Sequence, residues 1–148
     1  MNTSETTKAF IHAARDCAMQ LMQNATYIEK NLPTIEVPDG AAERIRSMCQ
    51  SLIGTKQDVM TELFELNEKA EVPSDLSPGV DRIEKWLSEA MAEMHEEVEA
   101  MRVAKERDDR FSLGFILLAE SGVNLLNAFN AVWDAAVELQ VRILPPAM

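Results

Sequence analysis

Most side chains in this sequence that could take part in chemistry are carboxylates, and several recur at helical spacing. Glu93 follows Glu89 by four residues and Glu96 follows by three more, so a helix would place all three on one face. Carboxylate oxygens suit hard cations such as Mg²⁺ or Mn²⁺. One hypothesis is therefore a Mg²⁺- or Mn²⁺-dependent hydrolase of a phosphorylated small molecule. Its candidate metal ligands are Glu89, Glu93, Glu96, Glu106 and Asp109.

The alternative for the same carboxylates is a charged surface that faces solvent and binds nothing. Basic residues nearby in the sequence, Arg82, Lys85 and Arg102, would balance part of its charge. Runs of acidic residues at helical spacing are common on the outer faces of acidic helices. We favour this interpretation over a metal site.

Two short acidic motifs can also be compared with a known family of helical enzymes. Glu93-x-x-Glu96 and Glu106-x-x-Asp109 resemble the motifs with which the all-α nucleotide pyrophosphohydrolases hold Mg²⁺. That family pairs its motifs across two helices. Here the stretch between the motifs is too short to bring two helices antiparallel, so the sequence is not assigned to the family.

The two histidines and two cysteines form no recognisable catalytic pattern. An alanine lies three residues before both His12 and His95, so the Glu-x-x-His pairs of di-iron bundles are missing. The sequence also lacks a glycine-rich phosphate loop. Cys17 and Cys49 fall at apolar helical positions, where free buried thiols are commoner than a disulfide. We therefore predict no catalytic residue and no cofactor.

Four long segments with helical periodicity must position all of these residues. The chain has 148 residues, of which 47% are hydrophobic, with only 5 Gly and 6 Pro. This composition is typical of a helical protein. The first helix is expected over residues 4–31, before Pro33. The second should begin with an Asp39 cap followed by Gly40 and end at residues 72–75.

Start and stop signals also mark the other two helices. The third should have Ser77 as its cap and Pro78 as its first helical residue, and Pro145 with Pro146 should close the fourth. Each segment spans roughly 28 to 33 residues, or about 42 to 50 Å of helix. Matched lengths predict an all-α, antiparallel, up-and-down four-helix bundle, with residues 1–148 as a single domain.

The connection between the third and fourth helices has two interpretations. We expect a turn near Asp108 to Ser112, with Asp109 or Ser112 capping the fourth helix. However, a seven-residue apolar repeat continues across this stretch and only Asp108 interrupts it. The alternative is one continuous helix, in which case two chains would complete the bundle as a dimer.

The fourth helix has more apolar residues than one buried face requires. Leu126, Trp133 and Val137 lie outside its main apolar stripe and are predicted to form an interaction surface. Alternatively, this helix is simply the most central one and buries them all. Polar Asn24 and Lys56 fall at inner positions of the first two helices, where such residues can fix the register of packing.

The excess of acidic residues limits the classes of molecule that this chain could bind. The formal net charge is −11 and the pI is about 4.6, which disfavours nucleic acid and anionic membranes. Residues 113–133 are long and apolar enough to span a bilayer, but they include one Ser and three Asn and have no basic flank, so we do not expect a membrane protein. The N-terminal residues lack the apolar core of a signal peptide, and a cytoplasmic location is expected.

The leading functional prediction is a non-enzymatic interaction protein. It would act as an adaptor, a chaperone-like binder or an assembly subunit, with a protein partner or a second copy bound through the fourth helix. The metal-dependent hydrolase remains the alternative.

Overall fold

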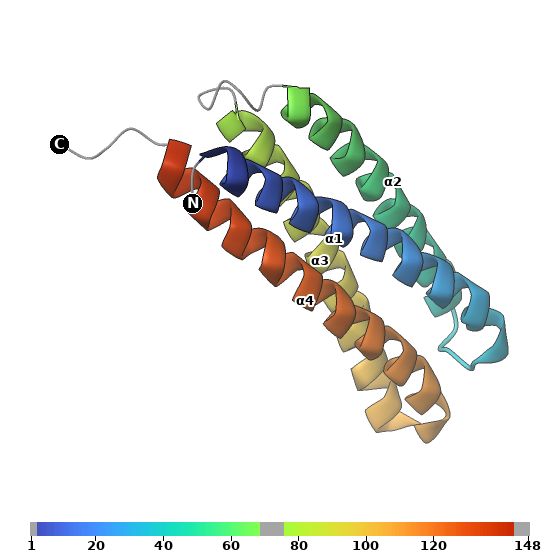
Figure 1. Cartoon of the computed structure of the whole chain (residues 1–148). Helices are drawn as coiled ribbons and strands as arrows, with labels where there is room; N and C mark the ends of the chain where they lie inside the picture. Colours follow the sequence, from blue (N-terminus) through green and yellow to red (C-terminus); the bar gives the residue numbers. More distant parts are fainter. Residues whose placement is uncertain (1–2, 69–75, 144–148) are drawn as a thin grey trace.

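Four long helices make up almost the whole chain in the structure, which is a computed structural model that describes residues 3–68 and 76–143 (Figure 1). Two short 3-10 segments lie in the connections. The elements are α1 (Thr3–Asn31), η1 (Leu32–Thr34), α2 (Ala41–Glu68), α3 (Leu76–Arg107), η3 (Asp109–Phe111) and α4 (Ser112–Ile143). The predicted all-α four-helix bundle is confirmed.

The helices pack in an up-and-down arrangement. α1 lies against α2 and α4, and α3 lies against α4 and α2, so neighbours in the sequence are neighbours in space. The connection between α1 and α2 and the turn between α3 and α4 lie at the same end of the bundle (Figure 1). There, Arg110 Nε of the turn lies 3.8 Å from the Glu36 carboxylate of the first connection.

A real turn separates α3 from α4, so the alternative of one continuous helix is wrong. Asp108 leaves the helical conformation, with φ −153° and ψ 116°. Its side chain accepts hydrogen bonds from the Arg110 backbone N–H at 3.0 Å and from Arg110 Nε at 2.8 Å. These bonds lower the pKa of the Asp108 carboxyl, the backbone bond most of all. Asp109 or Ser112 was predicted to cap the fourth helix. The structure instead shows Asp108 as the cap of η3, because any of several neighbouring polar side chains can accept a hydrogen bond from the free N–H groups of a short turn.

Two predicted helix starts also differ from the structure by a residue or two. At α2, Gly40 rather than Asp39 precedes the first helical residue, and Gly40 has φ +81°, a conformation that favours glycine. At α3, the helix begins at Leu76, so Ser77 and Pro78 lie inside its first turn. Proline fits there because the first N–H groups of a helix have no intrahelical partner. The predicted end of the second helix, residues 72–75, and Pro145–Pro146 lie outside the described residues.

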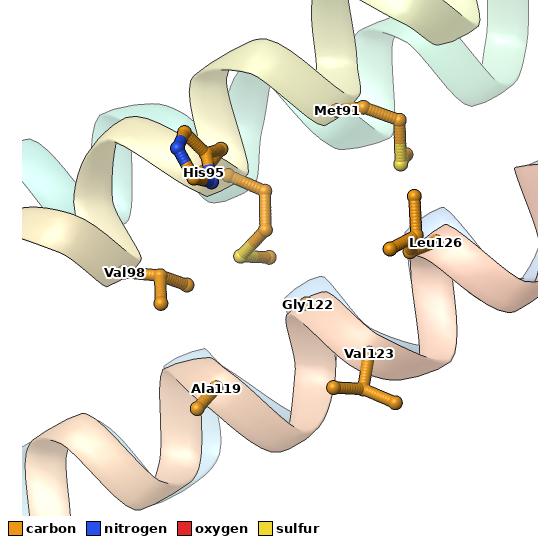
Figure 2. A pocket seen from close by; sticks show the side chains of 8 residues that line it. Met91, His95, Val98, Ala119, Gly122, Val123 and Leu126 are labelled. Carbon is orange, nitrogen blue, oxygen red and sulfur yellow. The ribbon is translucent and has the colours of Figure 1, made fainter.

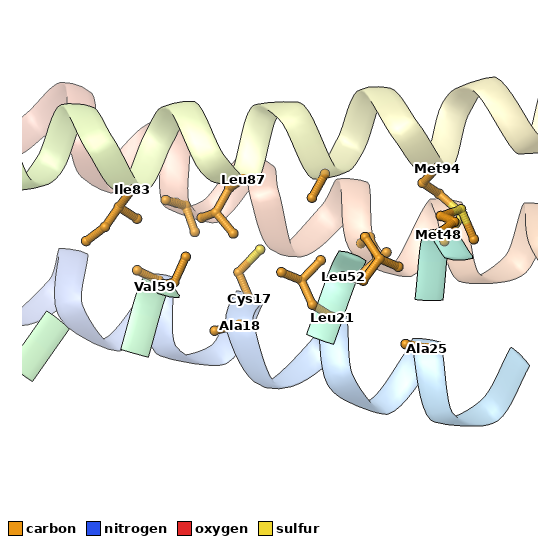
Figure 3. Close-up of a cluster of buried hydrophobic side chains, with 14 of the residues drawn as sticks. Cys17, Ala18, Leu21, Ala25, Met48, Leu52, Val59, Ile83, Leu87 and Met94 are labelled. Atoms are coloured by element: carbon orange, nitrogen blue, oxygen red, sulfur yellow. The ribbon is translucent and has the colours of Figure 1, made fainter. Parts of the chain in front are cut away.

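The core contains one buried face from each helix, and most of its residues fall at the predicted inner positions. Figure 3 shows Leu21 of α1, Leu52 of α2 and Leu87 of α3 together in it. Full burial of such a side chain stabilises the fold by about 1.5–3 kcal/mol. The largest fully buried side chains are Phe10, Leu21, Ile28, Ile45, Leu52, Leu66, Leu76, Ile83, Leu87, Met101, Leu118 and Leu125.

The inner face of α4 is turned slightly toward α1 compared with the prediction. Leu118 and Leu125 are buried as expected, but Phe115 and Phe129 are only partly buried, and Ser121 is buried instead. Nearby, Asn24 of α1 is 6% exposed. Its Oδ1 accepts a hydrogen bond from Asn124 Nδ2 of α4 at 3.4 Å, and its own Nδ2 donates to the Gln20 carbonyl at 2.8 Å. Lys56 is partly buried on α2.

Candidate functional site

The outward face of α4 carries large apolar side chains that are about half exposed. Leu126, Trp133 and Val137, the three residues predicted to form an interaction surface, are 50%, 52% and 49% exposed. Ile116 and Val123 are exposed to a similar degree on the same helix. A central position in the bundle therefore does not account for these five residues. It does account for Leu117, which is buried.

These residues follow one regular spacing. Starting at Ile116, steps of three and four alternate along α4 without a break as far as Val137. Residues at such steps share one face of a helix, and a seven-residue repeat of this kind is typical of a surface on which another helix packs. We call this set the outer seam. It comprises Ile116, Ala119, Val123, Leu126, Asn130, Trp133 and Val137.

Trp133 is the largest side chain of the outer seam and has a neighbour that supports it. Its ring lies 6.5 Å from the ring of Phe129, measured between centroids, at an interplanar angle of 42°. Tilted aromatic pairs at this separation attract each other. Phe129 is itself partly buried against the core, so the Trp133 indole rests on a supported surface while half of it faces solvent. Tryptophan is enriched among the residues that contribute most to binding in protein interfaces.

A shallow apolar cavity lies beside the outer seam, where α4 meets α3. Its volume is about 250 Å³. Figure 2 shows Met91 of α3 and Leu126 of α4 on opposite sides of it, while Gly122 leaves the middle of α4 without a side chain. A Cβ atom at Gly122 would lie 3.4 Å from Val98 Cγ2. His95 at the edge is the one titratable side chain that lines this cavity, so its surroundings offer little for catalysis.

The candidate metal ligands are spread along the bundle rather than gathered. Glu93 Oε1 accepts a hydrogen bond from Ser51 of α2 at 3.0 Å, and Glu106 pairs with Arg102 at 2.8 Å. Glu89 and Asp109 are exposed on α3 and η3, and Glu96 borders a groove between α2 and α3. Among residues 3–68 and 76–143, no three His, Cys, Asp or Glu side chains form a group that could hold a metal ion.

The groove between α2 and α3 is acidic, but its deepest carboxylate faces a cation. Glu97 has a side chain that is only 14% exposed, and its Oε1 lies 3.4 Å from Arg44 Nε. This atom has an ion-pair contact but no hydrogen bond of good geometry within the described chain. Further along the same pair of helices, the buried Glu62 carboxylate accepts hydrogen bonds from Arg82. We interpret these contacts as ion pairs that join α2 to α3.

The two cysteines are free and buried, as predicted. Burial raises the pKa of both Cys17 and Cys49 to about 12. A thiol with such a pKa stays protonated at neutral pH and is a poor nucleophile. Neither cysteine is therefore suited to nucleophilic catalysis.

The length and apolar character of α4 also meet the composition criteria for a membrane-spanning helix. The stretch Asp109–Gln140 has a mean hydropathy of 1.3 in its most apolar window, of which 28% is buried in the bundle. A helix that packs in the core of a bundle passes the same test, and α4 does so along its inner face. This property alone is weak evidence for a bilayer.

Two features of the candidate site were not predicted from the sequence. The cavity beside Gly122 depends on how α3 and α4 pack, and no sequence signal indicates it. Asn130, in contrast, was detectable, because it falls on the same three-and-four spacing as its apolar neighbours.

Comparison with protein-family models found no match to this chain, and comparisons with curated proteins and with solved structures found none either.

Proposed function

We propose that this protein is a non-enzymatic interaction protein that self-associates through the outer seam of α4. It would serve as an adaptor, a chaperone-like binder or an assembly subunit. The observation that carries the proposal is a row of five large apolar side chains, each about half exposed, on one face of one helix. Contiguous apolar surfaces of this kind in proteins mark interaction sites.

The electrostatics of the chain support the choice of this face. With a net charge of −11, most surfaces of two copies would repel each other. The seven seam residues carry no charge, so two copies can approach there without bringing like charges into direct contact. The free thiols fit a reducing compartment, and we propose the cytoplasm as its location.

The energetics of burial indicate how strong the association should be. Burying the exposed half of one large apolar side chain contributes about 1 kcal/mol. Five such residues on each of two copies would then contribute about 10 kcal/mol. Association costs about 4–15 kcal/mol in lost motion and ordering. The net gain is therefore at most about 6 kcal/mol, so we expect weak self-association, with a dissociation constant no tighter than tens of micromolar.

The test is sedimentation velocity over a wide range of protein concentration. The wild type should shift from monomer to dimer, whereas Trp133→Glu and Leu126→Glu should remain monomeric with unchanged helical circular dichroism. Phe64→Glu is the matched control, because Phe64 is a 69% exposed apolar residue on α2, away from the seam. That variant should dimerise like the wild type.

Other outcomes would count against the proposal. A wild type that stays monomeric at millimolar concentration contradicts self-association. Tight cosedimentation of the monomer with neutral phosphatidylcholine vesicles, lost in Trp133→Glu, would instead assign the outer seam to a lipid surface.

A further inference from the structure

We infer that two copies pair in parallel through the outer seam, so that their α4 helices run in the same direction and each seam residue faces its own counterpart. This inference rests on the proposed self-association and adds to it the direction and register of the pair. The seam spans about 22 residues, or roughly 33 Å of helix, which is enough for three heptads of side-by-side packing.

The residue types along the outer seam agree in part with those of parallel two-helix pairing. When heptad positions are lettered a to g from Ile116, the a positions of the seam hold Ile116, Val123, Asn130 and Val137. Its d positions hold Ala119, Leu126 and Trp133. In parallel coiled coils, β-branched residues at a with leucine at d favour two strands over larger assemblies, and the seam has three β-branched a positions and one leucine at d.

Asn130 is the only polar residue of the outer seam, and it separates the two possible directions. In a parallel pair, a positions face a positions, so Asn130 meets its own counterpart and the two amides can hydrogen-bond to each other. In an antiparallel pair, a positions face d positions. Asn130 would then meet an apolar residue such as Leu126 or Trp133, and its amide would be buried without a partner.

The charges beside the outer seam favour the same direction. Its e edge carries two carboxylates, Glu120 and Asp134, whereas its g edge carries Gly122, Phe129 and Ala136. An antiparallel pair would set the acidic edges of both copies next to each other. A parallel pair sets each acidic edge against the uncharged edge of the other copy. For a chain with a net charge of −11, that difference favours parallel pairing.

Disulfide cross-linking of variants with one added cysteine tests the direction in which the two copies pair. In a parallel pair, the Cα atoms of matching a positions lie about 6 Å apart, within reach of a disulfide. Val123→Cys and Val137→Cys should therefore each form covalent dimers with themselves under mild oxidation. Cys17 and Cys49 stay silent because burial raises the pKa of both thiols to about 12. Ala131→Cys, exposed on α4 but outside the seam, is the control and should stay uncrosslinked.

The possible results separate this inference from the proposed function. Cross-links that form between Val137→Cys and either Ala119→Cys or Leu126→Cys in a mixture, but in none of these variants alone, would mean an antiparallel pair, in which a positions face d positions: the inference fails and self-association stands. A dimer by mass with no cross-link in any of these variants or mixtures would place the interface elsewhere and overturn both. A monomer by mass without cross-links would contradict the proposed self-association, and the inference about direction would fail with it.

A second variant probes the role of Asn130 directly. Asn130→Val should tighten self-association by roughly tenfold, because a polar a position costs stability, and should allow mixed-direction pairs to form. Antiparallel pairs appear as cross-links between Asn130→Val,Val137→Cys and either Asn130→Val,Ala119→Cys or Asn130→Val,Leu126→Cys. Weaker association of Asn130→Val would contradict its assignment to the centre of the interface.

Discussion

The outer seam of α4 and the α2–α3 junction, by which we mean the ion pairs that join these two helices, both lie at the surface. They differ in whether their side chains have partners within the chain. At the junction, charged groups are paired within the chain: Glu62 with Arg82, and Glu97 with Arg44. Along the seam, apolar groups of comparable size stay half exposed. The acidic residues at the junction therefore contribute to the fold, whereas the apolar residues of the seam are the ones that we propose bind a second copy. Three experiments test this difference.

The largest effect should come from two adjacent leucines of α4. Leu125 is fully buried, whereas Leu126 is 50% exposed in the outer seam. Leu125→Ala should lower the free energy of unfolding by about 3 kcal/mol through lost burial and a new cavity. Leu126→Ala should lower the stability of the monomer by less than about 1 kcal/mol. Urea unfolding at low micromolar concentration measures both. Equal losses would mean that the seam is part of the core.

A smaller effect is expected at the α2–α3 junction. Arg82→Ala removes the guanidinium from the Glu62 carboxylate, which is only 8% exposed as a residue. The loss should be about 2 kcal/mol, less than for a fully buried pair because Arg82 itself reaches solvent. Arg102→Ala is the control, since its partners Glu99 and Glu106 are on the surface, and it should cause no measurable change. If Arg82→Ala is equally silent, the junction does not depend on this ion pair.

The smallest effect should follow the addition of metal ions. A site that bound Mg²⁺ or Mn²⁺ with a hundredfold excess over its dissociation constant would raise stability by about 2.7 kcal/mol. The acidic residues of α3 are dispersed and in part already paired, so we expect no rise in melting temperature beyond that of NaCl at equal ionic strength. A metal-specific rise of several degrees would instead favour the hydrolase hypothesis.

The sequence predicted the core better than it predicted the connections, and the physical reason is clear at particular residues. Leu21, Leu52 and Leu87 recur at a spacing that only one helix face can satisfy, so their burial follows from the pattern. Capping depends on local hydrogen bonds that several nearby residues can make. Asp108 therefore caps the turn where Asp109 or Ser112 was expected.

The candidate site also has one part that the sequence pointed to and one part that it did not. The exposure of Leu126, Trp133 and Val137 was one of two outcomes that the sequence allowed, because they exceed what one buried stripe uses but a central helix could have buried them. The cavity between α3 and α4 could not be predicted from the sequence. It arises where Gly122 of one helix faces Val98 of the other, and such a pairing depends on axial alignment that no single helix encodes.

The even number of helices has a consequence for how the molecule presents whatever is attached to it. α1 begins and α4 ends at the same end of the bundle, opposite the turn formed by η3 (Figure 1). In a parallel pair, the start of α1 and the end of α4 from both copies would gather at one pole of a rod about 45 Å long. The assembly would then be polar. A protein fused to either end would be displayed in two copies on one side, and the opposite pole would present only the two sets of connecting loops.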